Sequence, residues 1–311
     1  MKTKPSINTT LLSIEQKFKN CHIKNALIIL LVALCFPTIV QSQINNNTND
    51  AEPWNAQWIT GPGISINSWT ASRDASLKEY GVFKFRKTLE LEHVPTSFVV
   101  HLSGDNRYKL YVNGELTSQG PARGDLYFWN YETVDLAPFL KKGNNLIAAV
   151  VWNDGPVKPE AQITHLTGFI LQGDTKIEEV INTNDSWKTI EDESYEPLPV
   201  RVGGYYVAGP GELVDMSINI QGWEKLDYND KQWVQARVMG TGNLKQFAVN
   251  SSGWMLVPSP IPQMEMTKER LASTRLSSGV VVPKSFPAEK ADFSIPANSE
   301  AELCGKSFYP Y

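Results

Sequence analysis

The sequence predicts an all-β chain in which two successive β-sandwich domains of the jelly-roll type follow a signal peptide. Short apolar stretches recur about every 8–12 residues with turn-forming residues between them, as in sandwiches and barrels. No amphipathic helix of more than about three turns is visible before residue 264. The chain has 311 residues, of which 41% are hydrophobic and 20% charged, so it can bury a core. Its length suggests about two domains.

The first 42 residues have the composition of a secretory signal. Five lysines precede an apolar run over residues 26–40, and Val40-Gln41-Ser42 fits a cleavage site. The run is shorter than the roughly 20 residues of a spanning helix, although an uncleaved anchor remains an alternative. We therefore expect export to the periplasm or the extracellular space, with residues 43–52 as a polar linker and no membrane contact in the mature form.

The charge balance of the mature chain argues against nucleic acid as a partner. Five basic residues and one acidic residue leave with the leader, which gives 24 basic and 32 acidic residues and a formal charge of −8. No basic stripe remains. Cys304 is the single cysteine after residue 42, so no disulfide within the mature chain is expected.

The strand patterns are clearest in the first block, residues 53–181. Alternating apolar residues at 82–91 and 98–102 predict two strands, and Asn113-Gly114 signals a type I′ hairpin turn. The continuous apolar run Leu146–Trp152 predicts a strand that is buried on both faces.

Two further short strands are predicted at 169–171 and 177–181. Residues 135–140 favour a short helical turn or a strand end.

The second block, residues 182–262, contains two acidic turns that are each followed by a tryptophan, at 183–187 and 227–233. We expect Asx-type turns whose tryptophans pack inward. This block forms either a second sandwich or the completion of the first one. Residues 263–311 read as the start of another β-region, and 264–273 is the best helix candidate in the chain.

Familiar catalytic motifs are absent from the sequence. It contains no G-x-S-x-G elbow, P-loop, dinucleotide fingerprint or metal-ligand spacing, so we expect no cofactor and no metal. The acidic residues fall mostly in turns. Glycosidase carboxylates can come from distant strands, so the sequence does not identify such a pair.

One loop, residues 119–125, combines features that suit a sugar. Gly and Pro fix its course, Arg123 and Asp125 are polar, and four aromatic residues follow within 127–131. A pyranose ring needs directed hydrogen bonds and an apolar platform. The alternative is an internal Arg123–Asp125 salt bridge with the aromatic residues in the core. The candidate carbohydrate-binding residues are Asp105, Asn106, Arg107, Arg123, Asp125 and Trp129.

Several segments together resemble the N-terminal region of bacterial α-L-rhamnosidases of glycoside hydrolase family 78. They are WNAQWITGPG, the stretch from SGDNRYKLYVNG to IAAVVWNDG, NTNDSWKTI, GWEKLDYNDKQWVQA, WMLVPSPIPQMEM and FSIPANSEAEL. The resemblance implies galactose-binding-like sandwiches at the front and a catalytic (α/α)6 barrel at the back. The sequence ends at Tyr311 without such a barrel, and CGKSFYPY departs from the family pattern. We therefore expect a fragment truncated before the barrel, to which no catalytic residue is carried over.

The sequence leaves three functional interpretations. The first is a non-catalytic front part of a secreted α-L-rhamnosidase-like glycoside hydrolase that binds carbohydrate or braces the catalytic domain, with a rhamnose-containing glycan as the suspected partner. The second is a stand-alone carbohydrate-binding or adhesion module. The third is the front part of a β-galactosidase-type glycosidase.

Overall fold

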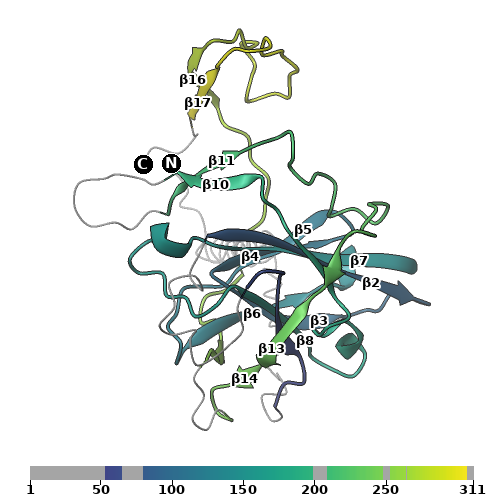
Figure 1. The fold of residues 1–311 in the computed structure, drawn as a ribbon. Helices are drawn as coiled ribbons and strands as arrows, with labels where there is room; N and C mark the ends of the chain where they lie inside the picture. The colour runs from purple at the N-terminus through teal and green to yellow at the C-terminus, as the bar shows by residue number, and fades with distance from the viewer. Residues whose placement is uncertain (1–52, 65–79, 199–208, 248–252, 264, 307–311) are drawn as a thin grey trace, which may run out of the picture. The chain divides into compact units, whose positions relative to one another are not determined.

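Two facing β-sheets form the main body of the protein in the computed structural model (Figure 1). The structure describes residues 53–64, 80–198, 209–247, 253–263 and 265–306. The predicted signal peptide (1–42) and linker (43–52) lie outside the described residues. Among the described residues, no helix has the length and apolar character needed to cross a lipid bilayer.

The larger sheet has seven strands, and the smaller has six. In spatial order, the larger sheet consists of β13 (Arg237–Thr241), β1 (Gln57–Thr60), β8 (Gly168–Gly173), β3 (Val99–Asp105), β6 (Trp129–Asp135), β15 (Met255–Pro258) and β14 (Asn243–Leu244). The smaller sheet consists of β12 (Val234–Gln235), β9 (Lys188–Glu191), β2 (Gly81–Leu91), β7 (Gly143–Asn153), β4 (Arg107–Val112) and β5 (Glu115–Gly120).

The remaining described elements are short. Two separate hairpins are β10 (Tyr195–Leu198) with β11 (Gly211–Val214), and β16 (Ser273–Ser278) with β17 (Glu302–Lys306). Three 3-10 turns are η2 (Ala137–Phe139), η3 (Gly155–Val157) and η4 (Glu178–Ile181).

The main core lies between the two sheets, because alternate residues of each strand point to the same face. Phe83 and Phe85 of β2 meet Phe169 of β8, and Phe85 stacks on Phe169 with ring centroids 5.8 Å apart. Two smaller apolar clusters cover the outer faces. One contains Trp129 and belongs to the larger sheet, and the other contains Trp233 and belongs to the smaller sheet.

The predicted all-β sandwich class is confirmed. Three described strands of residues 182–262 pair with strands of the first block, and they do so in both sheets: β9 with β2, β13 with β1, and β15 with β6. The second block therefore completes the first sandwich, which was one of the two options that the sequence left open.

Two strand predictions are confirmed in detail. Asn113 (φ 52°) and Gly114 (φ 87°) form the tight turn between β4 and β5, because an asparagine and a glycine both accept a positive φ. Strand β7 is buried on both faces: Ile147 and Val151 face the main core, whereas Leu146 and Ala148 pack under Trp223 and Trp233.

The two acid–tryptophan turns are also found, but asparagine side chains, and not the acidic ones, accept the hydrogen bonds that close them. Trp187 and Trp233 pack inward as expected. The Ser186 N–H donates to the side-chain oxygen of Asn184 at 2.8 Å. The Lys231 N–H donates to that of Asn229 at 3.2 Å, as in other Asx-type turns.

Two other predictions are wrong. Residues 177–181 do not form a strand: Glu178–Ile181 form the 3-10 turn η4, and the Glu178 carboxylate accepts a hydrogen bond from the Thr175 N–H (2.9 Å), which holds the preceding residues in a bend. The helix expected at 264–273 is absent from its described part, 265–273. Most of these residues are exposed, and a short helix with no apolar face to bury is marginal in water.

Candidate functional site

Asp105 and Asn106 of the predicted set are fully buried at the end of β3. The Asp105 carboxylate accepts hydrogen bonds from the His165 N–H (2.7 Å), the Trp254 Nε1–H (3.0 Å) and the Asn106 amide (2.7 Å). Burial raises the pKa of Asp105 to about 6, although these hydrogen bonds act in the opposite direction. The polar groups of both residues therefore face other parts of the protein and join the loops at this end of the sandwich.

Trp129 is a core residue in this structure. It is 2% exposed, and its Nε1–H donates to the Ser103 hydroxyl at 3.1 Å. The exposed aromatic rings of the predicted loop are instead Tyr127 (64%) and Phe128 (53%), which directly precede it.

Arg123 and Asp125 are exposed, and the salt bridge between them, which the sequence left as an alternative, is not among the ion pairs of the described residues. Asp125 Oδ1 accepts the N–H groups of Tyr127 (2.8 Å) and Phe128 (2.9 Å) in an Asx-type turn. The Asn130 amide donates to the Arg123 carbonyl at 3.0 Å. The loop is thus fixed by these two side chains, which leaves the Arg123 guanidinium available.

The fold brings Arg107, Asp154 and the loop of Arg123 to one end of the smaller sheet: Tyr108 pairs with Gly120, and the Asp154 N–H donates to the Asn106 side-chain oxygen at 2.9 Å. Burial lowers the pKa of Arg107, and the neighbouring charge of Arg123 acts in the same direction. Burial raises the pKa of Asp154, Glu212 adds to that rise, and both arginines oppose it. We call Arg107, Arg123 and Asp154 the arginine cluster. None of the three takes part in an ion pair within the described part of the chain.

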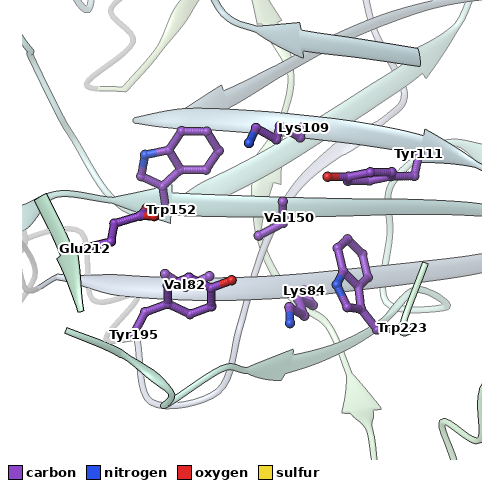
Figure 2. A pocket seen from close by; sticks show the side chains of 9 residues that line it. All are labelled: Val82, Lys84, Lys109, Tyr111, Val150, Trp152, Tyr195, Glu212 and Trp223. Carbon is purple, nitrogen blue, oxygen red and sulfur yellow. The ribbon is translucent and has the colours of Figure 1, made fainter. Parts of the chain in front are cut away.

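A pocket of about 170 Å³ lies on the outer face of the smaller sheet (Figure 2). Its floor consists of side chains from three neighbouring strands, which lie side by side because these residues are paired in the sheet. Trp152 of β7 lies between Val82 of β2 and Arg107 of β4, and Val150 lies between Lys84 and Lys109 in the next row. Side chains two residues apart on a strand share a face, so this grid points away from the main core.

The walls come from segments that are distant in the sequence. Tyr195 of β10 and Glu212 of β11 lie on the same face of their hairpin, since Glu212 pairs with Pro197, two residues after Tyr195. On the other side, Tyr111 meets Trp223 edge to face, with centroids 5.4 Å apart. Figure 2 shows these side chains around Val150.

Buried charges hold these walls against the sheet. The Lys84 ammonium pairs with Asp192, just before β10, and donates to the Ile220 carbonyl at 2.8 Å. The Arg86 guanidinium donates to the carbonyls of Trp223 and, at 3.0 Å, Lys225. The pocket is therefore shaped in advance of any ligand.

The sequence did not identify this pocket. The alternation in Arg107-Tyr108-Lys109-Leu110-Tyr111 is a signal for one polar and one apolar face, and it could have pointed to Lys109 and Tyr111. Trp152 was included in a continuous apolar run, which hides its direction. Tyr195, Glu212 and Trp223 join the site only through tertiary pairing.

The described residues contain no group of three or more His, Cys, Asp or Glu side chains placed to hold a metal ion. The pocket and the arginine cluster offer hydrogen-bond donors, acceptors and aromatic faces, which are features of binding sites.

Comparison with known proteins places the chain among glycosidase sequences. The model of the α-L-rhamnosidase N-terminal domain matches residues 95–255. A curated α-L-rhamnosidase of Alteromonas sp. (strain LOR) is 22% identical over 194 residues, covering 58% of this chain and 20% of that protein. One from Streptomyces avermitilis is 23% identical over 242 residues, covering 73% of this chain and 21% of that protein.

The fold is shared with a solved enzyme structure. The crystal structure of a family 78 rhamnosidase of Bacillus sp. GL1 superposes with a TM-score of 0.60 at 26% identity, covering 75% of this chain and 22% of that one. The chain thus spans about a fifth of the length of the curated relatives that it matches. Because the family model covers more than half of its residues, the chain belongs to the family of α-L-rhamnosidase N-terminal domains.

Proposed function

We propose that this chain is a non-catalytic, exported part of an α-L-rhamnosidase-type glycoside hydrolase and that it contacts carbohydrate through the arginine cluster. The observation that carries the proposal is that strand β4 with Arg107, the loop with Arg123, and Asp154 lie at one end of the smaller sheet, where the charges of the two arginines act on Asp154. Two guanidinium groups and a carboxylate supply the directed donors and acceptors that sugar hydroxyls require.

The neighbouring loop supplies the apolar part of such a site. Tyr127 and Phe128 expose their rings in the same loop that carries Arg123. The Asx turn of Asp125 and the bond from Asn130 fix that loop, so little conformational entropy would be lost on binding. Rhamnose-containing glycans are the expected ligands, in line with the family.

The first test measures hydrolysis and binding on the purified chain. We expect no turnover of aryl α-L-rhamnosides, and saturable binding of a rhamnose-containing glycan by calorimetry. Arg123→Ala should weaken that binding about 10-fold, as expected for the loss of a charged hydrogen-bonding group. The matched control is Arg275→Ala, because Arg275 is an exposed arginine on β16.

Either of two results would contradict the proposal. Turnover that a single carboxylate substitution abolishes would make the chain an enzyme. Equal binding by the Arg123→Ala and Arg275→Ala variants would remove the arginine cluster from the site. If no glycan binds to the folded chain, bracing of a catalytic domain becomes the better interpretation. The exposed Leu198 (48%) and Leu213 (52%) on the β10–β11 face away from Glu212 favour that second role.

A further inference from the structure

Trp152 is the exception among the tryptophans of this protein. Eight of the nine tryptophans lie in the part of the chain that the structure describes, and the other seven are at most 7% exposed. Trp152 is only partly buried and belongs to none of the three apolar clusters. A large aromatic ring that is left partly exposed in the lining of a pocket is available for contact with a ligand.

A positively charged and a negatively charged side chain lie near this ring. Lys109 Nζ lies 5.8 Å from the centroid of the Trp152 ring, and Glu212 lies beside the same ring in Figure 2. Neither Lys109 nor Glu212 forms an ion pair within the described ranges. The pocket thus offers one donor and one acceptor that no neighbouring charge neutralises.

Tyr80, at the start of β2, points independently to a missing partner. Its hydroxyl is buried, and it has no hydrogen-bond partner among the described residues. Burial raises the pKa of Tyr80 to about 12, and the nearby charges of Glu212 and Asp154 add to this rise. A buried hydroxyl without a partner is unfavourable, and a polar ligand or a water molecule beside Glu212 would supply the missing hydrogen bond.

We propose that the pocket lined by Trp152, Lys109 and Glu212 binds a single neutral pyranose residue of a glycan, as a subsite beside the arginine cluster, whose Arg107 pairs with Trp152 in the sheet. A pyranose has an apolar C–H face for the Trp152 ring and a rim of hydroxyl groups that need both donors and acceptors. Lys109 donates to one side of that rim, and Glu212 accepts from the other.

Size and charge favour this ligand over others. The pocket volume of about 170 Å³ is roughly ten times the space that one water molecule needs, which suits one ring and not a chain of rings. The opposite charges of Lys109 and Glu212 favour a neutral ligand, since a net anion or cation would be repelled by one of them. The buried Lys84–Asp192 pair fixes the walls, so the ring enters a preformed site.

The test uses the full chain and a panel of single-ring probes: methyl α-L-rhamnopyranoside, methyl β-D-glucopyranoside, glucuronate and adenosine. Tryptophan fluorescence reports on the site, because Trp152 is the tryptophan of the described part that is partly exposed, whereas the other seven are buried. We expect at least one neutral pyranoside to protect the fluorescence from acrylamide quenching and to bind saturably by calorimetry. Glucuronate and adenosine should bind more weakly.

The variants separate this site from the arginine cluster. Trp152→Ala should reduce binding of the neutral pyranoside by at least 10-fold, and Glu212→Gln should reduce it by a smaller factor. Arg275→Ala, on the exposed strand β16 outside both proposed sites, is the matched control and should bind the pyranoside normally. All variants should keep the wild-type melting temperature to within a few degrees.

Three outcomes would overturn the proposal. They are no saturable binding of any pyranoside to the wild-type chain, unchanged binding by Trp152→Ala, or tighter binding of adenosine than of the pyranosides. Loss of binding with Arg123→Ala alone would reject this site while leaving the proposed function in place. Loss of binding with Trp152→Ala alone would support this site and would count against binding by the arginine cluster.

Discussion

At the scale of single residues, Asp105 shows how a side chain that looks like a ligand contact can serve the fold. Its carboxylate is fully buried and accepts from Trp254 and from the backbone of the loop before β8. Because burial raises its pKa to about 6, the folded protein holds this proton more tightly than the unfolded chain, whose value is near 3.8. Stability contributed through Asp105 is therefore greatest near pH 4, falls as the pH rises to about 6, and levels off above that.

We predict that Asp105→Asn removes this pH dependence. A shift of two pKa units corresponds to roughly 3 kcal/mol. The free energy of unfolding of the wild-type protein should therefore fall by up to that amount between pH 4 and pH 7 because of Asp105. Urea unfolding of both proteins at the two pH values measures the difference. Glu132 and Asp154, whose pKa values are also raised by burial, are present in both proteins and cancel in the comparison. An equal change in both proteins would show that Asp105 does not titrate in this range.

At the scale of elements, two cationic side chains of strand β2 bind acidic residues of the segment that follows residue 181. Lys84 and Arg86 point to its outer face, where cationic residues would ordinarily be solvated. Instead, Lys84 pairs with Asp192, and Arg86 pairs with Asp230 at 3.1 Å. The side chains of Lys84 and Asp192 are 3% and 0% exposed, and that of Arg86 is 2% exposed. Both cations are thus buried, whereas the side chains of the Lys176–Glu179 pair are 84% and 26% exposed.

We predict that Asp192→Asn destabilises the protein by about 3–5 kcal/mol, because it leaves the Lys84 ammonium buried without a counter-charge. Glu179→Gln is the matched control and should cost less than about 1 kcal/mol, since water reaches its pair with Lys176. Urea unfolding at pH 7 measures both. Similar small losses for the two variants would mean that the Lys84–Asp192 pair does not hold the segment that carries the pocket walls.

At the scale of the whole molecule, local patterns predicted the strands well and the assembly poorly. The turn at Asn113-Gly114 and the two-sided burial of β7 depend on neighbouring residues, so the sequence revealed them. The pairing of β15 with β6 joins residues more than a hundred positions apart, and no local pattern encodes it. The same limit applies to the site: the sequence identified Arg107 and Arg123, but the pocket needs the β10–β11 hairpin to lie beside Trp152.

This long-range pairing leads to a prediction about where the chain can be divided. A shortened chain of residues 53–181 lacks β9, β13 and β15, each of which pairs with a strand of the first block. It also lacks Trp187, which is fully buried against Phe169 with centroids 5.7 Å apart. We expect this chain to show no cooperative thermal transition by circular dichroism, because two sheets are left with unpaired strands and an open core.

The matched control is a chain of residues 53–263, which keeps every described strand of both sheets and lacks only β16 and β17 among the described strands. It should unfold cooperatively and retain the near-ultraviolet signal of its packed tryptophans. A cooperative transition with that signal in the 53–181 chain would show that the first block folds by itself. The strands of residues 182–262 would then be additions to a complete sandwich, and their buried tryptophans would contribute little to its stability.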